Sequence, residues 1–169
     1  FHGAAHQAPQ EFFVVTTLPQ MRPAVKKGLK INYLSRPAIP SALLESRKTD
    51  TGFVKVASPE LTAADLIQYN GRIGGINRAS EVISELTESI DSARFDKAFV
   101  TSVPAAVTQR LGFILESVIG SIELAEALFW SASESAVNFF PVPLSTKAEK
   151  GRRRPETRWK IIVNENIEV

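Results

Sequence analysis

The sequence predicts an α+β fold in which a small mixed β-sheet, made of N-terminal strands plus a C-terminal strand, packs with about five α-helices. Three observations lead to this prediction. Segments rich in Phe, Val and Thr, which favour strands, occupy the first third of the 169 residues. From Ser58 to about Ser133, apolar residues recur at helical spacing. A short apolar run at 158–163 then predicts a last strand that returns to the sheet.

The N-terminal third is expected to be mainly extended. Its composition and partial alternation of apolar and polar residues predict strands at 11–17, 29–34 and 52–56. The segment 21–28 is expected to be a connector that ends at a turn on Gly28. Pro37 and Pro40 lack a backbone donor, so they interrupt any regular ladder after the second strand.

The first helix has a clear start signal. Ser58 can cap it, Pro59 suits the first helical position, and Glu60 favours the positive helix end. We expect this helix to end at about Tyr69, before Asn70 and a glycine. Periodic apolar residues predict four further helices, at about 76–90, 91–100, 104–120 and 121–133. The last two are joined closely enough to pair as a helical hairpin.

Bulk composition fits one globular domain over residues 1–169. The chain is 44% hydrophobic and 22% charged, and it has no cysteine, which excludes disulfides and thiolate metal sites. That is compatible with a cytoplasmic location. No apolar run approaches the roughly 20 residues that span a bilayer, so no membrane partner is expected.

Positive charge is concentrated near the C-terminus. Residues 147–160 hold seven cations and two acids, a local charge of +5 in a chain whose total is +2. A second basic segment, 21–55, has eight cations and two acids. Such segments suit an anionic partner, because each neutralised phosphate releases condensed counterions. The alternative is a solvated loop whose charge only keeps it soluble.

The sequence contains no recognisable catalytic or metal-binding constellation. His2 and His6 could share a helix face, but no acid or cysteine nearby completes a ligand set. Glu60 and Asp65 have no nucleophile or histidine beside them in sequence. The glycine-rich segment 71–75 follows a predicted helix, whereas phosphate-binding loops follow a strand. We therefore expect no enzyme activity, no metal and no cofactor.

Three large side chains are expected to be structural. Arg110 lies near the edge of an apolar helix face, where its stem can pack on the core and its head can pair with an acid. Trp130 and Trp159 adjoin apolar segments, and we expect both to be core anchors.

A resemblance to a known family emerges from motifs spread along the chain. In order, these are the opening residues 1–6, then 9–17, 51–62, 65–69, 109–116, 158–160 and 164–168. In this combination the chain resembles the C-terminal domain of the AbiEi family. The resemblance implies an antitoxin of a type IV toxin–antitoxin system that is also a transcriptional autorepressor, with a part in phage defence by abortive infection. It further implies a nucleotidyltransferase-like toxin as the functional partner, without a required stable complex.

The resemblance implies a protein in which an N-terminal winged helix-turn-helix is joined to this domain. The chain opens at Phe1 without a methionine, and a predicted strand follows almost at once. We therefore expect it to be a fragment that lacks the winged helix, which would read operator DNA.

In such a protein, the basic segments are candidates for holding the phosphate backbone while the winged helix reads bases. The first candidates for nucleic-acid binding are Lys150, Arg152, Arg153, Arg154, Arg158 and Lys160. The second are Lys26, Lys27 and Lys30. Two alternatives stay open: a nucleic-acid-processing enzyme domain, which would need clustered carboxylates for metal ions, and a structural dimerisation module.

Overall fold

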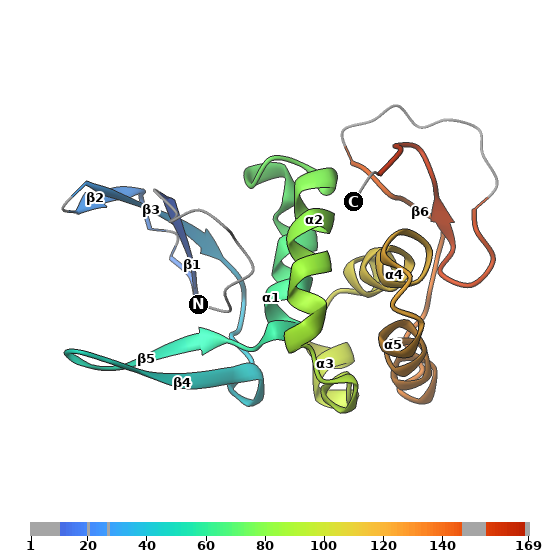
Figure 1. The fold of residues 1–169 in the computed structure, drawn as a ribbon, viewed down its shortest axis with the longest axis horizontal. Coiled ribbons are helices and arrows are strands. Elements are labelled where there is room, and N and C mark those ends of the chain that lie inside the picture. Colours follow the sequence, from blue (N-terminus) through green and yellow to red (C-terminus); the bar gives the residue numbers. More distant parts are fainter. Residues whose placement is uncertain (1–10, 20, 27, 147–154, 168–169) are drawn as a thin grey trace. The chain divides into compact units, whose positions relative to one another are not determined.

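A computed structural model describes residues 11–19, 21–26, 28–146 and 155–167 of the chain (Figure 1). Within them, five α-helices accompany small mixed and antiparallel sheets, so the α+β prediction is confirmed. The backbone divides into two compact units, one from Ala5 to Ala42 and one that contains everything from Leu43 onward. Each is described separately.

The N-terminal unit is a three-stranded mixed sheet in the order β1-β3-β2. Its central strand β3, Leu29–Ser35, pairs in parallel with β1, Glu11–Thr16, which confirms both predicted strands. The segment predicted as a connector also contains a strand, β2, Ala24–Lys26, which is antiparallel to β3. That prediction was wrong because three residues are too few to show a period; Gly28, with φ of +80°, allows the tight reversal.

The second unit begins with an antiparallel hairpin of β4, Leu44–Thr49, and β5, Gly52–Ala57. The sequence predicted β5 but missed β4. Most of β4 is polar (Glu-Ser-Arg-Lys-Thr) and exposed, so it carries no apolar alternation. Pairing with β5 fixes its extended conformation.

Helix α1, Pro59–Gln68, starts as predicted. The Ser58 side chain accepts a hydrogen bond from the Leu61 backbone N–H, and Pro59 occupies the first turn. A 3₁₀ turn and the pair Gly74 and Gly75, both with positive φ, lead into α2, Ile76–Leu86. The glycine-rich segment is thus a helix–helix connection.

The helix predicted at 91–100 is two shorter elements. A 3₁₀ turn, Ser92–Arg94, precedes α3, Lys97–Ser102. The break lies at Phe95 and Asp96, because the Asp96 side chain accepts from the Phe99 N–H and starts a new helix. Phe95 and Phe99 pack edge to face within the core, with ring centroids 5.0 Å apart.

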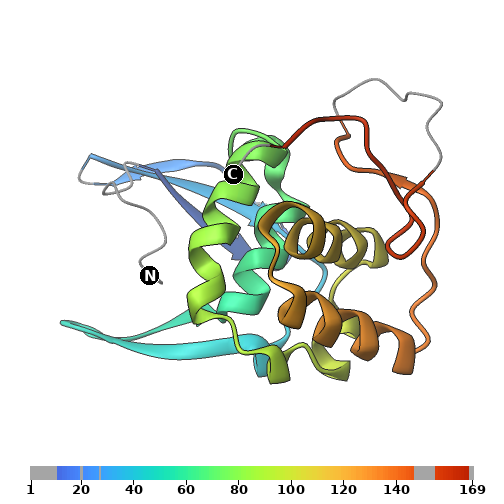
Figure 2. The same ribbon diagram turned by 45° about the vertical axis from the view of Figure 1, so that its right-hand side comes forward.

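The predicted helical hairpin is present. Helix α4, Ala105–Phe113, continues as a π-helical segment, Ile114–Ile119, which ends at Gly120 in a left-handed conformation. Helix α5, Ile122–Glu134, packs back against α4, and both ribbon views show the two helices side by side (Figure 2). A buried core joins this hairpin to α1 and α2.

A third small sheet lies near the C-terminus. Two-residue strands β6, Val142–Pro143, and β7, Ile161–Ile162, pair in parallel. The last strand therefore lies where predicted along the chain, but it pairs with β6 and does not return to the N-terminal strands. The sequence concealed this because β6 is short and contains a proline, which is atypical of a strand.

The two tryptophans have opposite environments. Trp159 is fully buried, as predicted. The same prediction for Trp130 was wrong: on α5 its side chain is 62% exposed. Within the part of the chain that the structure describes, none of the helices combines the length and apolar character needed to cross a bilayer.

Candidate nucleic-acid interface

Most of the predicted basic residues cannot be placed. Lys27, Lys150 and the arginines at 152–154 lie outside the described residues. Lys26 ends β2, and only its backbone is described. Lys30, Arg158 and Lys160 are described with their side chains.

Lys30 lies on β3 of the N-terminal unit, beside β1. Its Nζ is 2.7 Å from Glu11 Oε1, and the other Glu11 oxygen accepts from Asn32 Nδ2 at 3.1 Å. The hydrogen bond from Lys30 holds the pKa of Glu11 below its usual range. Both side chains remain about half exposed, so an incoming phosphate would compete with Glu11 for this ammonium group.

Arg158 is held in a cluster of the second unit. One guanidinium nitrogen donates to Glu116 at 2.7 Å and to Glu126 at 2.9 Å, and the group lies 4.4 Å from the centre of the Phe129 ring. These carboxylates raise the pKa of Arg158, and Arg158 lowers the pKa of Glu126. A guanidinium satisfied by two acids and an aromatic face has little charge to offer a phosphate.

The neighbouring Trp159 completes this cluster. Its indole N–H donates to the second oxygen of Glu116, and its ring packs against Phe129 and Phe139. The Glu156 carboxylate accepts from the backbone N–H groups of Arg158 and Trp159, which fixes the turn before β7. Arg158 is therefore a structural residue in this arrangement.

Lys160 is exposed and adopts φ of +53°, in the left-handed region. Its Nζ donates to the Phe139 carbonyl at 2.9 Å and pairs with no carboxylate of the described residues. A neutral acceptor leaves the full positive charge in place, so Lys160 remains available to an anion.

Helix α4 contacts the C-terminal strands through two polar side chains. The buried Gln109 donates from Nε2 to the carbonyls of Phe140 and Trp159, at 2.7 and 2.6 Å. Arg110 Nε donates to the Pro143 carbonyl at 2.9 Å, and burial lowers the pKa of Arg110. Arg110 thus has the expected structural role, and its head donates to a carbonyl where the sequence predicted an acid.

A cavity of about 400 Å³ lies at the base of the β4–β5 hairpin. Glu60 is buried there: Oε1 accepts from the Asp91 N–H at 3.0 Å, and Oε2 lies 3.5 Å from Arg94 Nε. Arg94 also binds Glu45, which pairs in turn with Arg47. These contacts join the hairpin, α1 and the 3₁₀ turn. No cluster of three potential metal ligands occurs among the described residues.

Comparison with known proteins identifies the family. The model of the AbiEi antitoxin C-terminal domain matches residues 1–117. The chain belongs to this family. No curated protein and no solved structure matched the chain. The match covers the N-terminal unit, the hairpin and the helices through α4, whereas α5, β6, β7 and the segment 147–160 follow it.

The AbiEi domain also exposes cations that the sequence motifs did not single out. Lys48 and Lys55 lie on the β4–β5 hairpin, and no ion pair or hydrogen bond of either side chain occurs among the described residues. Both lysines belong to the basic segment 21–55, in which the sequence predicted only Lys26, Lys27 and Lys30 as candidates for nucleic-acid binding. Without β4 in the prediction, their common face could not be recognised.

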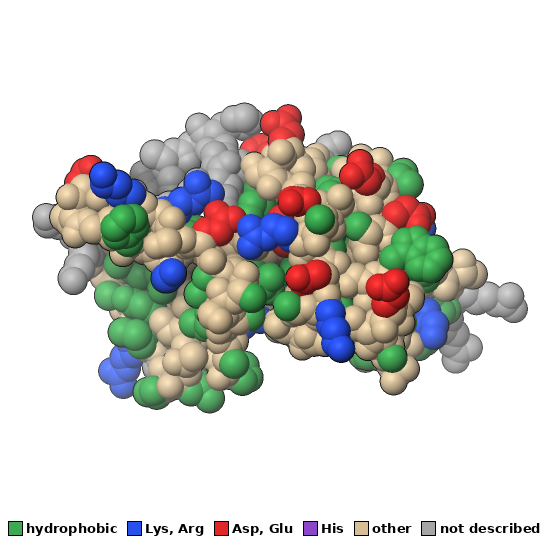
Figure 3. Space-filling model, turned by 90° about the horizontal axis from the view of Figure 1, so that it is seen from below, with side chains coloured by type: hydrophobic (Ala, Val, Ile, Leu, Met, Phe, Trp, Pro, Cys, Tyr) green, Lys and Arg blue, Asp and Glu red, His purple; other side chains and the backbone are tan. Residues whose placement is uncertain are grey.

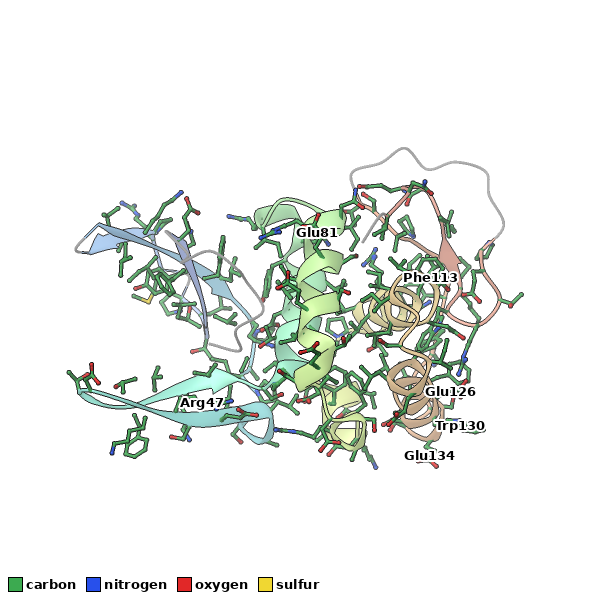
Figure 4. All side chains as sticks on the ribbon, viewed as in Figure 1. Arg47, Glu81, Phe113, Glu126, Trp130 and Glu134 are labelled. Carbon is green, nitrogen blue, oxygen red and sulfur yellow. The ribbon has the colours of Figure 1, made fainter. Side chains whose placement is uncertain are left out.

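The outer side of α5 has the opposite charge. Glu126, Trp130 and Glu134 follow one another at four-residue spacing and lie on the same side of the helix (Figure 4). Acidic side chains lie next to exposed hydrophobic ones on this part of the surface (Figure 3). The second unit therefore carries an acidic surface on α5 and cations on its hairpin.

Proposed function

We propose that this AbiEi domain is the antitoxin part of a type IV toxin–antitoxin system and contributes to transcriptional autorepression by binding DNA through its basic segments. The observation that carries the proposal is the family match over residues 1–117. In this proposal the domain acts in the cytoplasm through its surfaces and is not an enzyme.

The placement of the carboxylates supports action without catalysis. Glu60 and Glu116 are engaged with an arginine and with an N–H donor, and both contacts join separate elements of the fold. A general base or metal ligand needs an open face toward a substrate. Both oxygens of Glu116 are committed to structural contacts, whereas Glu60 lines the cavity and its Oε2 has only the 3.5 Å ion pair with Arg94.

The distribution of cations along the chain supports the proposed binding to DNA. Cations of the N-terminal unit (Arg22, Lys26, Lys27, Lys30 and Arg36) outnumber its single acid, Glu11. The segment 147–160 adds the largest local charge of the chain. Phosphate contacts of this kind fix the position of a protein on DNA, while sequence is read elsewhere. Operator recognition would then rest on a winged helix-turn-helix in the same protein.

The functional partner in this proposal is a nucleotidyltransferase-like toxin whose effect the domain opposes without a required stable complex. Co-expression of the domain with the toxin encoded beside it tests this directly. We expect growth to recover, although the two proteins do not co-purify. Failure of the domain to restore growth at a matched protein level would overturn the antitoxin proposal.

The DNA-binding part needs a separate test. Replacing the arginines at 152–154 together with alanine in the operator-binding protein should weaken repression and binding about equally across DNA sequences, and should lessen the salt dependence. The matched control removes three exposed cations of the helical region: Arg72, Arg78 and Lys97. Equal effects of the two triple variants, or unchanged salt dependence in the first, would contradict the proposal.

A further inference from the structure

The β4–β5 hairpin presents two chemically different faces. In an antiparallel pair, residues directly opposite each other point to the same side, and neighbours along a strand point to opposite sides. One face carries Lys48 opposite Phe53 and Ser46 opposite Lys55. The other carries Arg47 opposite Val54 and Glu45 opposite Val56. We call the first of these the Phe53 face.

The Phe53 face is anchored at its base and open at its outer end. Leu44 and Ala57, the pair nearest the helices, pack against the hydrophobic core. Beyond them, Lys55 and Lys48 are exposed, and the Phe53 side chain is 76% exposed. Hydrophobic and cationic side chains lie next to one another over this hairpin (Figure 3). The core therefore holds a ribbon whose outer part displays an aromatic ring between two ammonium groups.

Within the two strands, the charge on the Phe53 face is of one sign, and the turn that joins the strands adds one exposed acid, Asp50. The only acid within the two strands, Glu45, lies on the opposite face, where it binds Arg47 at 2.8 Å and Arg94 at 2.9 Å. Lys48 is directly across from Phe53, and Lys55 is two residues along the same strand, about 6.8 Å away. Two cations thus flank the ring at short range.

Protection of an edge strand explains only part of this arrangement. Lysines on exposed strands discourage pairing with other chains, and both strands of this two-stranded sheet are edges. An exposed phenylalanine works against that protection, because it adds an apolar group to the same surface. The exposed ring is complementary to a ligand with a flat apolar face, and the two lysines are complementary to an anionic group on the same ligand.

We infer that the Phe53 face binds single-stranded nucleic acid, with an unpaired base stacked on Phe53 and the flanking phosphates held by Lys48 and Lys55. Bases in a duplex are stacked on each other, whereas unpaired bases offer their faces to aromatic side chains. No acid of the strands opposes phosphate on this face, so the charge is complementary. Lys48 and Lys55 belong to the basic segment 21–55, but neither is among the cations named above as candidates for holding operator DNA.

The test uses the whole chain and a fluorescein-labelled oligothymidylate of about 12 nucleotides, within the usual site size. Fluorescence anisotropy should show that Phe53→Ala weakens binding by about 5- to 150-fold, the range for loss of one stacked base. An abasic strand of the same length keeps the phosphates and removes the bases. Its affinity should be the same for Phe53→Ala and for the unchanged protein.

Lys48→Ala and Lys55→Ala should weaken binding of both strands, and each should reduce the slope of log K against log salt by about 0.7. Two variants serve as controls. Arg47→Ala removes a cation from the opposite face of the same hairpin, and Phe140→Ala removes another phenylalanine, 50% exposed, outside the hairpin. Neither should change the preference for the strand that has bases.

The inference is overturned if the unchanged protein binds oligothymidylate no better than the abasic strand. It is also overturned if Phe53→Ala, folded by circular dichroism, binds as well as the unchanged protein or loses as much affinity as Phe140→Ala. Tighter binding of a duplex of the same length, unaffected by Phe53→Ala, would reassign the hairpin to duplex DNA. None of these assays contains the operator or the toxin, so the antitoxin proposal stands or fails separately.

Discussion

Replacement of Gly112 by alanine tests the close packing of α4 against Trp159. Gly112 lies within α4 and faces the ring of Trp159. A Cβ atom at this position would come well inside 3.0 Å of three ring atoms, so the ring or the helix would have to move. The ring is fully buried and is fixed by Phe129, Phe139 and the hydrogen bond to Glu116.

Two effects of opposite sign set the magnitude. Alanine in a helix interior is favoured over glycine by about 1 kcal/mol, which alone would stabilise the protein. Overpacking of a well-packed site costs about 1–3 kcal/mol, and more where the neighbours are fixed. Because Trp159 is held on several sides, we expect the steric cost to dominate and the variant to lose about 2 kcal/mol of unfolding free energy. For a chain of this size that corresponds to about 4–8 °C in Tm.

Urea unfolding followed by tryptophan fluorescence and circular dichroism measures this loss. Gly120→Ala is the matched control, since its Cβ would meet nothing within 4 Å and only the positive φ opposes it, at about 1 kcal/mol. In a Trp159→Leu background, where the ring is absent, Gly112→Ala should be neutral or stabilising. If Gly112→Ala alone is as stable as the unchanged protein, the deduced contact with Trp159 is wrong.

Two further changes address the polar contacts of the second unit. Gln109→Leu removes the donor that binds the carbonyls of Phe140 and Trp159, and an unsatisfied buried group costs about 1–3 kcal/mol. It should therefore lower the urea midpoint strongly, whereas Gln68→Leu, on an exposed position of α1, should not. Glu126→Gln should lower the Tm at neutral pH and leave it unchanged in acid. Because Arg158 lowers the pKa of Glu126, the charged form stabilises the fold above the unfolded value of about 4.3, and this contribution disappears as pH falls through the lower folded pKa. Tm values of the two proteins measured from pH 7 to pH 3 should converge; a constant difference would contradict the ion pair.

Local signals in the sequence predicted the helical part well. The helix start at Ser58 and the turns at glycine depend on hydrogen bonds and backbone angles of a few neighbouring residues. A short segment of sequence is therefore enough to predict them. The split near Asp96 was missed although its cap is also local. The apolar periodicity around Phe95 and Phe99 continues across the break and conceals it.

Pairing between distant segments was much less predictable. Strand β4 is polar and becomes a strand through its partner β5, and β7 pairs with a two-residue strand that contains proline. The exposure of Trp130 likewise depends on which side of α5 meets α4, and this is set by tertiary packing. The ion pairs of Arg158 with Glu116 and Glu126, 42 and 32 residues away, are also set by tertiary packing, and the local charge of the segment does not reveal them.

The end of the family match at residue 117 is not a boundary of the fold. Three positions of the matched part, Gln109, Gly112 and Glu116, meet the segment that contains Trp159, well beyond the match. Gln109 has no described partner other than backbone groups of this C-terminal segment, and Gly112 provides the space that the indole ring fills. The Gln109 side chain finds its hydrogen-bond partners, and the space at Gly112 is filled, only when the C-terminal segment is in place. The described part of the C-terminal segment is therefore an integral part of the second unit.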